Sequence, residues 1–261
     1  MNAVSENRKS EILKLLEKIE CEREVRMLYA CESGSRAWGF ESKDSDYDVR
    51  FIYVRERDWY LSIDVEKKRD VIELPIEGEL DVNGWDLRKT LQLLLKSNPP
   101  LMEWLSSPIV YLDREGFADR IREIAKTVYH PTAVRYHYFS MAKGNYREFL
   151  RGESVIRKKY LYVLRPLLAV EWIERGMGMV PTEFQILVDR VVEDEKLRKE
   201  IDELLVLKRA GKEMDRGAPF PAIHSYVEST IKAKEKETFT ADKPVGRAEE
   251  LNELFRFFVT E

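Results

Sequence analysis

Two short apolar runs joined by a polar connection constrain the fold more than any other feature of the sequence. The first run, VRMLYACESG, ends at Gly34, and the second, YDVRFIYV, extends from Tyr47 to Val54. Apolar runs of this length that are bounded by turn residues are typical of buried strands. The sequence therefore predicts two strands, and the connection GSRAWGFESKDSD brings a glycine, a serine, an arginine and several acids between their ends.

The rest of the N-terminal part predicts further helices and strands. Apolar residues recur at helical spacing over residues 6–22, with Ser5 available as a helix cap. Residues 70–83 indicate two more strands separated by Pro75 and Gly78, and the pattern DLRKTLQLLLKSNPP predicts a helix that stops at its prolines. This order of elements predicts a small α+β domain with a mixed β-sheet flanked by helices.

Long amphipathic patterns replace the strand patterns in the second part of the chain. The first is REGFADRIREIAKTVY and the last is RAEELNELFRFFV. Pro131 and Pro181 lie where helices are expected to start, whereas Pro166 interrupts a helical pattern and predicts a kink. We therefore expect two domains, an α+β domain at residues 1–110 and an all-α helical domain at residues 111–261.

Composition and charge exclude few kinds of partner. The net charge of −4 is the sum of 44 basic and 48 acidic side chains, so a local basic patch that binds nucleic acid is compatible with this total. The two cysteines are isolated, the N-terminus lacks the apolar core of a signal peptide, and no apolar run is long enough to span a bilayer. We expect a cytoplasmic protein without membrane contact, and the sequence does not predict its oligomeric state.

The second strand begins with an acid pair, Asp46 and Asp48. Because side chains alternate along a strand, both are expected on one face, close enough to share a divalent cation. Adjacent carboxylates repel unless a cation lies between them, and oxygen ligands favour Mg²⁺ or Mn²⁺ over zinc. Asp81, in the alternating run ELDV, is the expected third carboxylate of a two-metal site. Asp86 is an alternative for the third place, although GWDLRK predicts that it caps a helix.

The start of the connection has the chemistry of a phosphate-binding turn. Gly34 and Ser35 offer bare backbone N–H groups and a hydroxyl to phosphate oxygens, and Arg36 is placed to reach the same phosphates. In the helical part, the stretches MAKGNYREF and RKKYLYVLRP combine basic and aromatic residues, which suits binding of a triphosphate and stacking of a base. The residues expected to bind the nucleotide there are Lys143, Lys159, Tyr160 and Arg165.

These motifs resemble those of the polymerase-β nucleotidyltransferase superfamily. The resemblance is carried by Gly34 and Ser35, a spacer, the pair Asp46 and Asp48, and a later strand aspartate. Longer segments are similar to the predicted nucleotidyltransferases of RNA repair pathways, over roughly residues 28–220. These segments are GSRAWGFESKDSDYDVRFIYV, GWDLRKTLQLLLKSNPPLMEWLSSPIVY and KKYLYVLRPLLAVEWI.

The resemblance implies a catalytic nucleotidyltransferase domain followed by a helical domain that binds nucleotide or substrate. The implied reaction moves a nucleoside monophosphate from an NTP to an acceptor hydroxyl, releases pyrophosphate and requires Mg²⁺ or Mn²⁺. Asp46 and Asp48 correspond to the metal ligands of the superfamily, and Asp81 to the third carboxylate, which acts on the attacking hydroxyl. Gly34 and Ser35 correspond to the triphosphate turn. The family association implies an RNA end as the acceptor.

Other interpretations of the same residues remain open. The site could transfer AMP to a protein or small-molecule hydroxyl, or it could bind a nucleotide without catalysis. Asp46 and Asp48 are also compatible with a solvated acidic hairpin, and Asp81 with an ordinary edge strand. For the basic residues of the helical part, the alternative is surface ion pairing. The sequence predicts neither the base of the NTP nor a requirement for a template.

Overall fold

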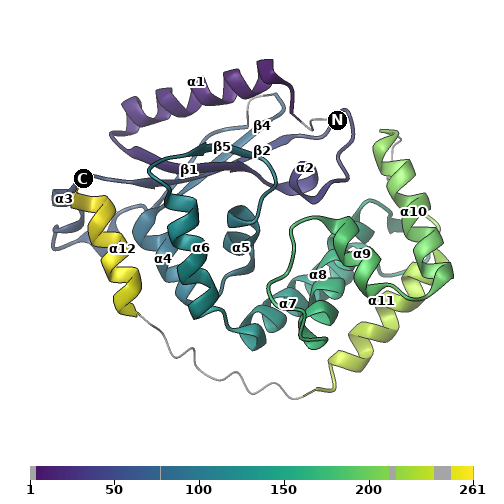
Figure 1. Ribbon diagram of the computed structural model, residues 1–261. Coiled ribbons are helices and arrows are strands. Elements are labelled where there is room, and N and C mark those ends of the chain that lie inside the picture. The colour runs from purple at the N-terminus through teal and green to yellow at the C-terminus, as the bar shows by residue number, and fades with distance from the viewer. Residues whose placement is uncertain (1–3, 77, 212–215, 238–247, 261) are drawn as a thin grey trace. The chain divides into compact units, whose positions relative to one another are not determined.

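The computed structural model describes residues 4–76, 78–211, 216–237 and 248–260. The chain divides into two compact units, whose elements are labelled in Figure 1. The first unit comprises Met1–Ala37, Asp46–His130 and Pro244–Glu261, and the second comprises Trp38–Ser45 and Pro131–Lys243. Each unit therefore contains segments that are distant in the sequence.

The first unit is built on a five-stranded sheet, and the mixed sheet flanked by helices that the sequence predicts is confirmed. The strand order is β3-β4-β2-β1-β5. β2 and β4 are parallel, and the other neighbouring pairs are antiparallel. The strands are β1 (Arg26–Glu32), β2 (Tyr47–Val54), β3 (Val71–Glu73), β4 (Leu80–Asp86) and β5 (Val110–Asp113).

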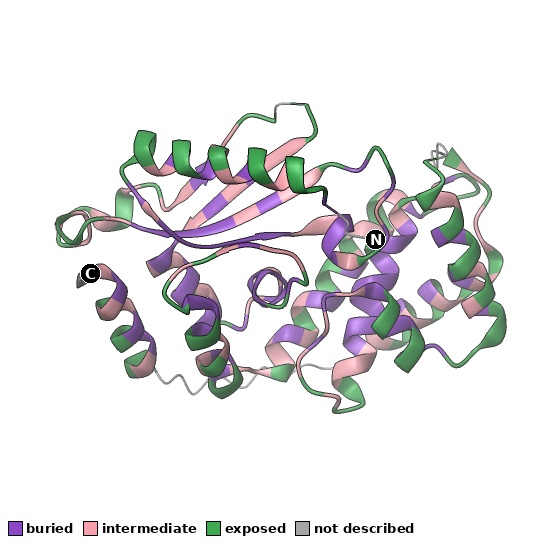
Figure 2. Cartoon of the chain, turned by 45° about the horizontal axis from the view of Figure 1, so that its top comes forward, coloured by how far each residue is buried: buried purple, intermediate pink, exposed green. Residues whose placement is uncertain are grey.

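Helix α1 (Glu6–Arg23) covers one face of this sheet. Its buried residues Ile12, Leu16 and Ile19 form one core with strand residues such as Val49 and Phe51. The outer face of α1 is exposed, as Figure 2 shows. The predicted helix and its cap are confirmed, because the Ser5 side chain accepts a hydrogen bond from the Arg8 N–H. The apolar stripe thus fixes which side of α1 packs on the sheet.

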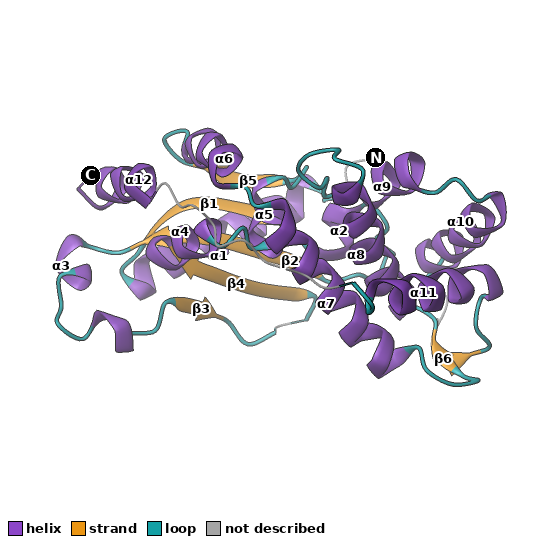
Figure 3. Cartoon of the chain, turned by 90° about the horizontal axis from the view of Figure 1, so that it is seen from below, coloured by secondary structure: helices purple, strands orange, loops and turns teal. Residues whose placement is uncertain are grey.

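The opposite face of the sheet, away from α1, carries α4 (Leu87–Leu95), α5 (Pro99–Leu105) and α6 (Phe117–Val128), as Figures 1 and 3 show. The Phe117 ring lies 6.4 Å from that of Tyr29 on β1 and 5.3 Å from that of Phe258. Phe258 belongs to α12 (Ala248–Thr260), so the last helix packs beside α6 in the sheet unit. Short helices α3 (Arg57–Tyr60) and η1 (Val65–Lys67) connect β2 to β3. The unit therefore extends past residue 110 and includes the described C-terminal helix.

Several local predictions need correction. Gly34 opens a short helix, α2 (Gly34–Trp38), where the sequence predicted only a tight turn. Helix α4 ends at Leu95, before the prolines of KSNPP, and Ser97 follows with a positive φ of +51°. Pro99 instead starts α5, because proline has no N–H to lose at the first helical position. Strand β5 was missed, since its four residues form a strand by pairing with β1.

Gly84 on β4 is a position where the sheet has no room for a side chain. A Cβ built there would lie 2.0 Å from Cε2 of Phe51, its register partner on β2. We expect Gly84→Ala to lower the free energy of unfolding by about 3 kcal/mol, because the core must shift to accept the methyl group. Urea unfolding followed by circular dichroism measures this, with Gly144→Ala as the control, since a Cβ at Gly144 meets nothing within 4 Å. Equal urea midpoints for Gly84→Ala and the unmodified protein would contradict the packing described.

Asp86 caps α4, as predicted, and is buried. Its Oδ1 accepts the Arg88 backbone N–H at 2.8 Å, and its Oδ2 accepts the Tyr60 hydroxyl at 2.7 Å. Burial raises the pKa of Asp86 to about 6, against the opposing effect of these hydrogen bonds. The raised pKa means that the folded state binds the proton more tightly than the unfolded state, so ionisation of Asp86 destabilises the fold.

A pH dependence of stability follows from Asp86. Asp86 contributes most to the free energy of unfolding below pH 4. This contribution falls by on the order of 3 kcal/mol as the pH rises to about 6, the pKa of Asp86 in the folded protein. Asp86→Asn keeps a capping oxygen but removes this titration, so the variant should gain stability relative to the unmodified protein as the pH rises across that range. Urea unfolding at several pH values tests this, with Asp194→Asn as a second N-cap replacement. A stability difference that does not change with pH would contradict the prediction.

The second unit is helical and contains the loop that joins α2 to β2. The loop packs inside this unit, because the Phe40 ring lies 5.7 Å from that of Phe184 and the Lys208 Nζ donates to the Ser42 Oγ at 3.0 Å. Pro166 lies inside a helix of this unit, and the kink predicted there stays a prediction. The helices are α7 (Pro131–Phe149), α8 (Lys159–Glu174), α9 (Phe184–Val191), α10 (Glu195–Arg209) and α11 (Pro221–Lys234), with two-residue strands β6 (Val155–Ile156) and β7 (Arg216–Gly217).

None of the helices in the described ranges combines the length and apolar character needed to cross a membrane.

Candidate active site

The turn after β1 brings backbone against an acid of β2. Gly34 has a φ of +56°, and a Cβ built on it would lie 1.9 Å from Oδ2 of Asp48. The Ser33 N–H also donates to the Asp48 carbonyl at 2.8 Å. A side chain at position 34 would therefore displace the carboxylate, so glycine is required both for the backbone conformation and for this close approach.

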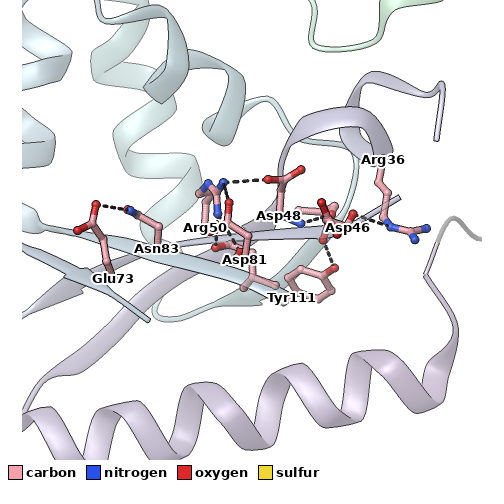
Figure 4. Close-up of polar contacts among 10 residues, drawn as sticks. Arg36, Asp46, Asp48, Arg50, Glu73, Asp81, Asn83 and Tyr111 are labelled. Carbon is pink, nitrogen blue, oxygen red and sulfur yellow. Dashed lines mark hydrogen bonds and ion pairs between the residues drawn. The ribbon is translucent and has the colours of Figure 1, made fainter. Parts of the chain in front are cut away.

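Asp48 and Asp81 lie side by side on the parallel strands β2 and β4, where they are register partners. The guanidinium of Arg50 lies between them, with its Nη2 2.9 Å from Asp48 Oδ1 and 2.8 Å from Asp81 Oδ2 (Figure 4). Burial raises the pKa of Asp48, Arg50 lowers it, and the charges of Asp81 and Asp46 raise it further. The carboxylates that the sequence predicts on neighbouring strands are thus brought together, with a cation of the chain itself between them.

Glu32, at the end of β1, supports this arrangement from the interior. It is fully buried, and its Oε1 accepts the Asp48 backbone N–H at 2.8 Å. The Tyr111 hydroxyl donates to its other carboxylate oxygen. Burial raises the pKa of Glu32 to about 7, against the lowering effect of the hydrogen bonds from Tyr111 and Asp48. The roles of Glu32 and Arg50 were not predicted from the sequence, although the sequence shows an acid inside an apolar run and a base two residues after Asp48.

Asp46 and Arg36 lie at the entrance to β2. Asp46 is exposed and precedes the first residue of the strand. Arg36 is buried, donates from Nε to the Asp46 carbonyl at 3.2 Å, and lies 3.8 Å over the centre of the Tyr47 ring. Ser35 is buried in α2 beside Gly34. The predicted phosphate contacts of Ser35 and Arg36 stay predictions.

The donor set suits a hard divalent cation. In the described part of the chain, no three His, Cys, Asp or Glu side chains converge tightly enough to enclose a metal ion. Mg²⁺ does not need such a cage, because it usually keeps waters and is bound through one or two carboxylates together with substrate phosphates. Asp48 and Asp81 supply two carboxylates that already hold a cation, the Arg50 guanidinium. These residues therefore fit Mg²⁺ or Mn²⁺. Asp46, which the sequence predicts as a metal ligand together with Asp48, lies close enough to influence Asp48 electrostatically.

Lys143 and Lys159 lie in the helical unit and have partners there. The Lys143 ammonium pairs with the Glu235 carboxylate at 2.8 Å, and the Lys159 Nζ lies 4.4 Å from the centre of the Phe149 ring and 4.8 Å from that of Tyr162. The basic and aromatic residues of these stretches are thus interleaved as the sequence indicated. Their contact with a nucleotide stays a prediction.

Tyr160 and Arg165 are buried inside the same unit. The Tyr160 hydroxyl is hydrogen-bonded to His224 Nδ1 at 2.8 Å. The Arg165 guanidinium donates to the Thr182 carbonyl at 3.2 Å and lies 4.9 Å from the centre of the Trp38 ring. Both side chains therefore stabilise the helical unit, and nucleotide binding by either would be a second role.

Comparison with known proteins favours the same class of protein as the geometry of the site. Residues 9–257 match the family described as the RNA repair pathway DNA polymerase beta family. The chain is 49% identical over 223 residues to the uncharacterized protein YcgL of Bacillus subtilis (strain 168), which covers 85% of each protein. A solved nucleotidyltransferase-like protein from Exiguobacterium sibiricum 255-15 is 12% identical, and the alignment covers 95% of this chain and 90% of that protein. The two structures superpose with a TM-score of 0.31, which is too low to support an argument.

The match to the family extends over almost the whole sequence, so it includes the Gly34 turn, the helical unit, and the aspartates Asp46, Asp48 and Asp81. It confirms the resemblance inferred from the motifs and supports a nucleotidyltransferase of the polymerase-β type. The chain belongs to the RNA repair pathway DNA polymerase beta family.

Proposed function

We propose that the protein transfers a nucleoside monophosphate from an NTP to an acceptor hydroxyl and releases pyrophosphate, with Mg²⁺ or Mn²⁺ as cofactor and an RNA end as acceptor. The observation that carries the proposal is the pair Asp48 and Asp81, whose carboxylates lie side by side while Asp48 Oδ2 faces the Gly34 turn. Nucleotidyl transfer needs two features of this kind. One is a turn that can approach phosphates, and the other is a pair of carboxylates that can hold a cation.

The two carboxylates are suited to different tasks. Asp48 directs Oδ2 at the turn, and its side chain is 25% exposed, so we assign it to the nucleotide phosphates. The Asp81 side chain is 36% exposed, and we assign it to the incoming acceptor hydroxyl. A bound Mg²⁺ would supply Lewis-acid stabilisation of the phosphate charge. Gly34 and Ser35 would orient the triphosphate through their backbone N–H groups.

The RNA acceptor rests on the description of the family. It is tested by incubating the protein with each α-labelled NTP, Mg²⁺ or Mn²⁺, and a mixture of RNA, DNA and cellular protein, and then separating the fractions. We expect label on RNA. Label on protein or on a small molecule would replace the acceptor but keep the reaction, and binding without any labelled product would indicate a nucleotide-binding module.

The double variant Asp46→Asn/Asp48→Asn is the control for this experiment. Amide side chains cannot supply the charge that holds the metal, so the variant should label none of the fractions. RNA labelled equally by the variant and by the unmodified protein would contradict the proposed site.

A further inference from the structure

Arg50 is anchored in the site by both branches of its guanidinium. Nη1 donates to the Asp81 carbonyl at 2.9 Å and to the Val49 carbonyl at 3.2 Å. Nη2 contacts one carboxylate oxygen of Asp48 and one of Asp81. Its side chain is only 16% exposed, so water screens these contacts weakly. The backbone contacts fix the guanidinium between the carboxylates, where a point charge such as lysine would make fewer bonds.

This position is also where a divalent cation shared by Asp48 and Asp81 would be attracted. A guanidinium and a divalent ion at one carboxylate pair repel each other, and the repulsion is strong in a partly buried site. The negative charges of a triphosphate offset this repulsion, because they add to those of the two aspartates. A metal ion that binds alone therefore meets uncompensated repulsion from Arg50. A metal ion that binds together with a nucleotide meets less, because the triphosphate adds negative charge.

On the basis of the function proposed above, we propose that Arg50 is an internal cation that neutralises Asp48 and Asp81 in the nucleotide-free protein and opposes binding of a metal ion without a nucleotide. Metal binding then depends on the nucleotide, which is a coupling between two ligands at one site. Arg50 is a positioning residue in this account, because it acts through the two aspartates.

The test measures Mn²⁺ binding without nucleotide, from the electron paramagnetic resonance signal of free Mn²⁺. Arg50→Met removes the charge, and we expect it to bind Mn²⁺ at least about tenfold more tightly than the unmodified protein. Arg50→Gln is a second neutral variant with the same expectation, in case the first does not fold. Arg50→Lys keeps the charge and should bind within about threefold of the unmodified protein. Adding Asp48→Asn to Arg50→Met should reverse the gain and so locate the ion.

Arg114→Met is the matched control, because Arg114 is a partly buried arginine of the same unit that pairs with Glu20 at 2.8 Å. It should leave Mn²⁺ affinity unchanged. The proposal fails if the neutral variants bind Mn²⁺ no more tightly than the unmodified protein, or if Arg114→Met gives the same gain. Because no step of this test requires turnover, its failure is distinct from that of the transfer reaction, which is measured separately as labelled product from the unmodified protein.

Discussion

Asp48→Asn is expected to reduce nucleotidyl transfer by about a thousandfold while the protein stays folded. The amide is neutral, so it loses both the ion pair with Arg50 and the charge that favours a metal ion. Burial raises the pKa of Asp48, so its ionised form is less favourable in the folded than in the unfolded protein. This offsets part of the lost ion pair, and we expect the free energy of unfolding to change by about 1 kcal/mol, as for a typical single substitution.

Transfer is measured as the rate of label incorporation at saturating NTP, and folding by urea unfolding of the same preparation. Asp119→Asn is the control, because Asp119 is an exposed carboxylate on α6 that pairs with Arg122 at 3.3 Å. It should transfer at the unmodified rate. A folded Asp48→Asn variant that retained more than about a tenth of the activity would remove Asp48 from the catalytic site.

Gly34→Ala is expected to reduce transfer by about a hundredfold, because the new methyl group would lie 1.9 Å from Asp48 Oδ2 and force that carboxylate away from the turn. The positive φ of +56° adds backbone strain of about 1 kcal/mol for any residue with a Cβ. The loss of activity should therefore exceed what the loss of stability explains.

Gly39→Ala separates these two effects. Gly39 also has a positive φ, +83°, but a Cβ there meets nothing within 4 Å. We expect Gly39→Ala to lose only the free energy of unfolding that the positive φ costs, and Gly34→Ala to lose at least as much because of its additional close contact. Both losses are measured in urea, and only Gly34→Ala should lose transfer. If both variants transferred equally well, the close approach of Gly34 to Asp48 would have no catalytic importance.

Local patterns in the sequence were sufficient to predict elements whose residues determine them directly. The apolar stripe of α1, the two runs that became β1 and β2, and the capping role of Asp86 all depend on neighbours within a few residues. The same reasoning placed Asp48 on a strand with its side chain on one face. The family resemblance supplied the expectation that Asp81 would lie beside it.

Contacts between distant segments could not be predicted in this way. Glu32 and Arg50 acquire their roles from register, because β1 pairs with β2 and β2 with β4, and a local pattern does not define which strands are neighbours. The segment Trp38–Ser45 belongs to the helical unit, where Phe40 packs on Phe184. The described part of the C-terminus, α12, packs in the sheet unit through Phe258. These placements arise from tertiary packing.

The central claim, nucleotidyl transfer at the site formed by Asp48 and Asp81, is tested most directly by following two labels of one NTP. The protein is incubated with Mg²⁺, an RNA with a free 3′ hydroxyl, and NTP labelled at the α-phosphate in one sample and at the γ-phosphate in another. We expect the α label to join the RNA and the γ label to appear as pyrophosphate in equal amount. Transfer of the γ label to an acceptor, or its release as orthophosphate, would contradict nucleotidyl transfer at this site.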